Sequence, residues 1–258
     1  MVFGNGNVCN MSTHAAAGKQ WTEAELDGLM VEDQFRQRGM EVTRLDTFVD
    51  AAFAFVLTLL VISFDEIPAN YPEMLEAAKR IPGFAASFAV LMMFWLQHRR
   101  WSRRYGLESF KTIVQSLTLI FVVLVYVYPL RMIFEGMFAN LSGGWLPTSY
   151  QIENYNELRM IFVFYSVGFL AMSLLVSQLY RTAMNSSTSL ALNQIELRKT
   201  RVAMHTWLLA AGFALASILV ALVAPDTWVQ AAGYMYFALI AAMRIPSLLD
   251  RRRHEAAA

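Results

Sequence analysis

Charged residues are scarce in this sequence, and it contains a single cysteine. Only 16% of the 258 residues are charged, whereas 57% are hydrophobic, and a soluble domain is nearer one quarter charged. Cys9 has no second cysteine in the chain, so an internal disulfide framework is excluded. The net charge of +1 gives no reason to expect nucleic acid as a partner. The first 20 residues lack a basic start and an apolar run, so no secretory signal peptide is expected.

Motifs of enzymes and of several channel classes are also missing. The sequence has no Gly-rich phosphate loop, no serine elbow and no His, Cys and carboxylate set with metal-ligand spacing. We therefore expect no enzyme activity, no cofactor and no bound metal. The filter sequence Thr-Val-Gly-Tyr-Gly is absent, and no apolar run carries a ladder of arginines. Both absences argue against a filter-loop channel and against voltage sensing.

Long apolar runs dominate what remains. A hydrocarbon core of about 30 Å needs about 20 apolar helical residues to cross it. Runs of about this length cover residues 47–64, 82–97, 113–134, 158–179, 203–224 and 229–245. They lack the alternation of a membrane barrel, so helices are the remaining way to satisfy the backbone in lipid. The sequence predicts an all-α integral membrane protein with six transmembrane helices over residues 47–247, a segment 1–46 and a basic tail 248–258.

The distribution of Lys and Arg predicts the orientation of these helices. Basic residues gather in the segments after the second and fourth runs and in the tail, and few lie in the alternate segments. The basic groups are Arg99, Arg100, Arg103, Arg104 and Lys111, then Arg181, Arg198, Lys199 and Arg201, then Arg251, Arg252 and Arg253. Both termini are therefore predicted to be cytoplasmic, in a multi-pass protein of the cell (plasma) membrane.

Local signals predict further elements. Thr22 and Glu25 fit a capping box that starts an amphipathic helix, which Gly39 would end. Pro129 should kink or end the third transmembrane helix. Arg131 and Glu135 are one turn apart there and can pair.

The first apolar run carries two features with alternative interpretations. A stripe at helical spacing contains Phe48, Ala52, Phe55, Leu59, Ile62 and Glu66, with Thr58 beside it and Asp65 at its outer end. It either lines a central axis, with apolar constrictions and an acidic mouth, or is an ordinary packing face, which the residues alone favour. Asp50, near the inner edge, either contacts a second helix at the level of Trp95, His98 and Arg99 or faces headgroup water. The sequence leaves this choice open.

The first run resembles the opening helix of a known family. Arg44-x-x-x-Phe48-Val-Asp50-Ala-x-Phe53-Ala, followed by Thr58-Leu59-Leu60, is similar to a motif of the transmembrane protein 175 family of potassium channels. Phe94-Trp95-Leu96-Gln97-His98 resembles the family's second helix, and Tyr128-Pro129 resembles its third. Similarity beyond the third run is mainly topological.

The resemblance implies a homotetramer of six-helix chains with the pore lined by the first helix. The constriction would then fall on Phe55, Leu59 and Ile62, with Thr58 as a polar neighbour and Asp65 and Glu66 at the outer mouth. The motif residues Arg44, Phe48 and Asp50 would pack with Trp95 and His98 and brace the pore helix.

Two positions depart from the family pattern. Val49 replaces a serine of the motif and removes a hydroxyl from the bracing contacts. Phe55 is larger than the usual aliphatic residue, so four copies at one level would narrow the pore.

The predicted function is passive conduction of potassium ions through a homotetrameric pore. The partners would be further copies of the chain, the lipid bilayer and potassium ions, with no nucleic acid. One alternative is a proton-coupled or other small-solute transporter, but the runs hold few ionisable residues near their centres. Another is a non-conducting scaffold or sensor that binds a partner through its first 46 residues.

Overall fold

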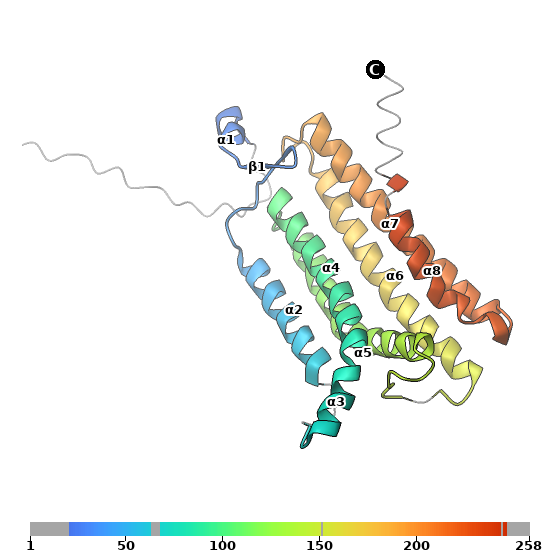
Figure 1. The fold of residues 1–258 in the computed structure, drawn as a ribbon. Helices are drawn as coiled ribbons and strands as arrows, with labels where there is room; N and C mark the ends of the chain where they lie inside the picture. Colours follow the sequence, from blue (N-terminus) through green and yellow to red (C-terminus); the bar gives the residue numbers. More distant parts are fainter. Residues whose placement is uncertain (1–20, 63–67, 151, 244, 247–258) are drawn as a thin grey trace, which may run out of the picture.

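The computed structural model describes residues 21–62, 68–150, 152–243 and 245–246. Long helices lie side by side in this part of the chain, and a short hairpin sits at one end of the bundle (Figure 1). Asp65, Glu66 and the basic tail at 248–258 lie outside the described residues, as do residues 1–20.

Each predicted apolar run falls on one helix of the structure. These helices are α2 (Arg44–Ile62), α4 (Ile81–Tyr105), α5 (Phe110–Leu141), α6 (Tyr155–Asn185), α7 (Gln194–Val223) and α8 (Ala231–Ala242). Among the described residues, α4, α5, α6 and α7 are long and apolar enough to cross a membrane. The shorter elements are α1 (Glu23–Asp27), β1 (Val31–Glu32), β2 (Phe35–Arg36), α3 (Tyr71–Lys79) and the 3₁₀ turn η1 (Asp226–Trp228). The prediction of an all-α membrane protein is confirmed.

Polar caps define where the long helices begin. Ser109, Asn154 and Asn193 each accept a hydrogen bond from the backbone N–H three residues later, at the start of α5, α6 and α7. Such caps satisfy backbone donors that the first helical turn leaves free. At its other end α4 stops at Gly106, whose φ of 56° favours glycine.

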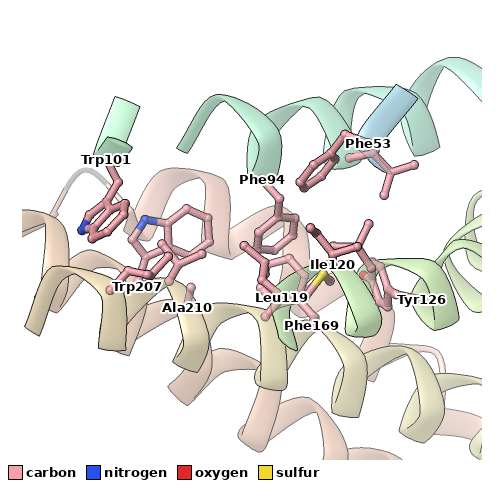
Figure 2. Close-up of a cluster of buried hydrophobic side chains, with 14 of the residues drawn as sticks. Phe53, Phe94, Trp101, Leu119, Ile120, Tyr126, Phe169, Trp207 and Ala210 are labelled. Atoms are coloured by element: carbon pink, nitrogen blue, oxygen red, sulfur yellow. The ribbon is translucent and has the colours of Figure 1, made fainter. Parts of the chain in front are cut away.

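The core is a layer of aromatic side chains between α4, α5, α6 and α7. Phe94 of α4 lies 5.3 Å from the Trp207 ring and 5.6 Å from the Phe169 ring, centroid to centroid. Figure 2 shows these rings with Trp101 and Tyr126 around them. The helix α2 packs against α4 and α5, whereas α7 and α8 lie on the far side of the bundle (Figure 1). Among the residues that the structure describes, one long side of α2 therefore has no packed neighbour.

The helix α5, which covers the third predicted apolar run, bends as Pro129 predicts. Pro129 lies inside α5, and the last part of α5 turns away from the axis of its first part (Figure 1). The predicted pair forms, with Arg131 Nε 2.6 Å from Glu135 Oε1, and both side chains are buried. Glu135 Oε2 also accepts the backbone N–H of Ser149 at 3.0 Å. The bent end of α5 is thus fastened to the loop that follows it.

The helix predicted between Trp21 and Gly39 is wrong beyond its first turn. The capping box of Thr22 and Glu25 is present, but α1 ends at Asp27 and a β-hairpin follows. Its turn residues Asp33 and Gln34 have φ of 51° and 57°, and Val31 pairs with Arg36 across the hairpin. Two consecutive left-handed residues are typical of a type I′ turn.

Candidate functional site

The first turn of α2 is fixed both by its own cap and by α4. Thr43, just before the helix, donates from Oγ1 to Asp46 Oδ2 at 2.9 Å and accepts the backbone N–H of Asp46 at 3.1 Å. Asp46 Oδ1 in turn accepts the Ser102 hydroxyl of α4 at 2.5 Å. The sequence analysis missed both the cap and the contact with Ser102. The cap could have been found, because Thr43 and Asp46 have the spacing of a reciprocal helix cap.

Asp50 lies one turn further along α2 and contacts the second long helix. The indole Nε1 of Trp95 donates to Asp50 Oδ1 at 2.8 Å. The guanidinium of Arg99 lies over the same indole, 5.3 Å from its centroid. Of the two interpretations of Asp50, the structure therefore favours a contact with another helix. Asp50 is nonetheless exposed in the single chain.

Of the other residues of the predicted bracing motif, His98 lines the same cavity as Asp50 and Trp95, whereas Arg44 and Phe48 do not line it. His98 is buried, and its Nε2 lies 2.9 Å from Ser116 Oγ of α5. Arg44 and Phe48 are exposed. Within one chain the structure thus brings Asp50, Trp95 and His98 to one cavity, although the hydrogen-bond partner of His98 is Ser116 of α5 rather than Asp50.

The helix α2 is buried along one face only. Val49, Phe53, Val56 and Leu60 are each 1–2% exposed, and they recur at the spacing of one helical face. Val49, which departs from the family serine, thus belongs to the apolar core, where a valine needs no hydrogen-bond partner. By helical geometry the opposite side of α2 is centred near Ala51 and Thr58.

The predicted constriction residues lie toward this unpacked side. Phe55 is 57% exposed. Thr58 is exposed as well, and its hydroxyl donates to the carbonyl of Phe55 at 2.7 Å. Leu59 is half-buried at the edge of the unpacked side. The side chain of Ile62, with Asp65 and Glu66, lies outside the described residues.

The contact between Asp50 and Trp95 gives a prediction for stability. Trp95→Phe keeps an aromatic ring but removes the donor to Asp50, so we expect the free energy of unfolding to fall by about 1 kcal/mol. Thermal unfolding of the purified protein in detergent measures this. Trp145→Phe, which changes an exposed indole, is the matched control and should have a smaller effect. Equal melting temperatures for the two variants would contradict a stabilising role for this bond.

These features define a multi-pass helical membrane protein whose first long helix is held on one face and open on the other. Comparison with known proteins places it more closely. The model of the family described as "Endosomal/lysosomal potassium channel TMEM175" matches residues 44–129. A potassium channel from Marivirga tractuosa is 31% identical over 198 residues, covering 74% of this chain and 79% of that protein.

A solved structure agrees with both matches. The crystal structure of a variant of the potassium channel MtTMEM175, in complex with a nanobody–MBP fusion protein, has a TM-score of 0.75 and 27% identity. The similarity covers 86% of this chain and 99% of that chain. The chain belongs to the TMEM175 family of potassium channels, so the expectations of a channel family and of no enzyme are confirmed.

Proposed function

We propose that this chain conducts potassium ions passively through a homotetrameric pore lined by α2. The observation that carries the proposal is the one-sided burial of α2, because its unpacked side is left to face lipid, another chain or a central axis. The family membership and the relatives' names as potassium channels support the choice of ion.

An exposed carboxylate at the inner end of α2 favours an axis over lipid. Asp50 lies at the border of the unpacked side, with Oδ1 bonded to Trp95, and a carboxylate facing hydrocarbon costs several kcal/mol unless it is fully paired or hydrated. A water-filled inner vestibule would hydrate it. Further out, rings of Phe55, Leu59 and Ile62 would form an apolar constriction that opens by wetting. Thr58 would add hydroxyls to this constriction, and Asp65 and Glu66 would attract cations at the outer mouth.

The proposal includes the membrane arrangement. We infer that α2 and α8 cross the membrane with the four longer helices, giving six spans per chain. The 19 residues of α2 correspond to about 28 Å of helix, close to the hydrocarbon thickness. The basic residues at the α4–α5 and α6–α7 ends would face the cytoplasm, and both termini with them. The membrane would be the cell membrane, as befits a chain with a bacterial relative.

Reconstitution tests the proposal. Purified protein in liposomes should take up potassium under a potassium gradient, above the level of empty liposomes and of liposomes with heat-inactivated protein. Its mass in mild detergent should be that of four chains. A folded monomer, or a folded tetramer that carries no potassium, would contradict the proposal. In the second case the scaffold or sensor alternative would take its place.

A further inference from the structure

The hairpin and the residues after it form a docked segment, residues 31–39, which we call the N-terminal strap. It lies across the end of the bundle where α4 ends and α7 begins (Figure 1). Phe35 of the strap is fully buried, and its ring meets the Tyr105 ring of α4 edge-on at 5.4 Å. The strap is thus part of the folded core rather than a free tail.

A buried ion pair fastens the strap to α7. The guanidinium of Arg38 donates to both carboxylate oxygens of Glu196, at 3.1 and 2.9 Å, and both side chains are 0% exposed. Arg38 Nε also donates to the carbonyl of Leu190 at 2.8 Å. Glu196 accepts two backbone N–H groups, from Arg36 at 2.8 Å and from Asn193 at 3.0 Å. Removing one partner would leave the other charge buried without its counter-ion, which is strongly unfavourable.

The backbone of the strap also packs directly against the backbone of the last turn of α4. The backbone N–H of Gly39 donates to the carbonyl of Arg103 at 2.9 Å. A Cβ at Gly39 would stand 2.3 Å from the carbonyl oxygen of Ser102 and 2.9 Å from the Cα of Gly106. Glycine is therefore required at this position, since backbone meets backbone.

Four residues connect the strap to α2. Residues 40–43 separate Gly39 from the first residue of the helix. Ser102 serves both segments, because its carbonyl lies under Gly39 and its hydroxyl donates to Asp46. A cavity of about 480 Å³ lies beside this connection, lined by Met40, Val42 and Asp46 among others. The strap and the first turn of α2 are thus held at the same residue of α4.

We propose that Arg38 and Glu196 are positioning residues of the pore, a role that rests on the proposed function of α2. By docking the strap on α7 and α4, they fix the point and direction from which the chain enters α2. This sets which side of α2 faces the axis. Four copies must present the same residues at once, so even a modest loss of order in each strap reduces the fraction of conducting tetramers sharply.

Neutralising Glu196 tests this role against a matched change at an exposed carboxylate that pairs with the hairpin. Glu196→Gln removes the carboxylate paired with Arg38, and Arg38→Ala removes the arginine. The control is Asp27→Asn, because Asp27 is a carboxylate paired with Arg36 at 3.6 Å in an exposed contact. We expect potassium flux per tetramer to fall several-fold in Glu196→Gln and Arg38→Ala and to stay unchanged in Asp27→Asn.

Hydrogen–deuterium exchange gives a readout independent of conduction. In the two strap variants, exchange should accelerate in residues 31–39 and also in the first turns of α2, while α6 stays protected and the tetramer elutes unchanged. If Arg38→Ala fails to fold, Arg38→Lys replaces it, because lysine keeps the charge but not the two-pronged geometry. We expect Arg38→Lys to accelerate exchange in the same segments, by less than Glu196→Gln does. Faster exchange confined to the strap, or flux that does not fall, would overturn the proposal. If the parent protein does not conduct, the proposed function is contradicted instead. The exchange rates of α2 would then still show whether the strap orders the start of α2.

Discussion

Replacing Leu59 by asparagine is expected to raise potassium flux into liposomes about tenfold. Leu59 lies at the edge of the unpacked side of α2, where four copies would form an apolar ring. Amides at this level favour water in the constriction, and a barrier lowered by about 1.4 kcal/mol is a tenfold gain in rate. Phe55→Asn should act in the same direction, because Phe55 is more exposed than Leu59.

The control for this prediction is an amide on a helix far from α2. Leu215 on α7 is 50% exposed, and α7 lies on the opposite side of the bundle (Figure 1). Leu215→Asn should leave the flux of a folded tetramer unchanged. Equal flux in the parent, Leu59→Asn and Phe55→Asn proteins would show that this stretch of α2 does not form the constriction.

Removing Glu135 is expected to lower the stability of the protein strongly. Its carboxylate pairs with Arg131 at 2.6 Å in a buried site and accepts the backbone N–H of Ser149. Glu135→Ala leaves the arginine without this carboxylate at the bend of α5, which should lower the free energy of unfolding by about 3 kcal/mol. Thermal unfolding of purified protein, with the yield of folded tetramer, measures the loss.

A pair of the same length on the surface provides the comparison. Glu76 lies 2.6 Å from Lys79 within α3, but its side chain is 62% exposed. Glu76→Ala should cost less than about 1 kcal/mol, since water screens exposed pairs. If the two variants lost the same stability, burial would not be what makes the Arg131–Glu135 pair important.

The long apolar runs of the sequence predicted the positions of the long helices well. The six apolar runs coincide with α2, α4, α5, α6, α7 and α8. Among the described residues, four of these helices, α4 to α7, are long and apolar enough to cross a bilayer. The bend at Pro129 and the Arg131–Glu135 pair followed from rules that act within one turn. The contact of Trp95 with Asp50 was one of two alternatives that the residues left open, and the family resemblance implied it.

Contacts that depend on tertiary packing could not be read from the sequence. The hairpin was missed because Asp33 and Gln34 occupy the left-handed turn positions where Asn-Gly would have given a signal. The partner of Arg38 is 158 residues away, and the partner of His98 is a serine on α5. Neither pairing leaves a local pattern, since each is fixed only when the helices pack.

The claim that α2 lines the pore is tested most directly by blocking potassium flux at a single cysteine on the unpacked side of α2. With Cys9→Ser as background, Thr58→Cys should be blocked by a positively charged thiol reagent, because water and cations reach this side of α2. Leu215→Cys on α7 should be modified without block, or not at all. Block at Thr58→Cys alone is the result that the account predicts. Full flux after complete modification of Thr58→Cys would contradict the claim that α2 lines the pore.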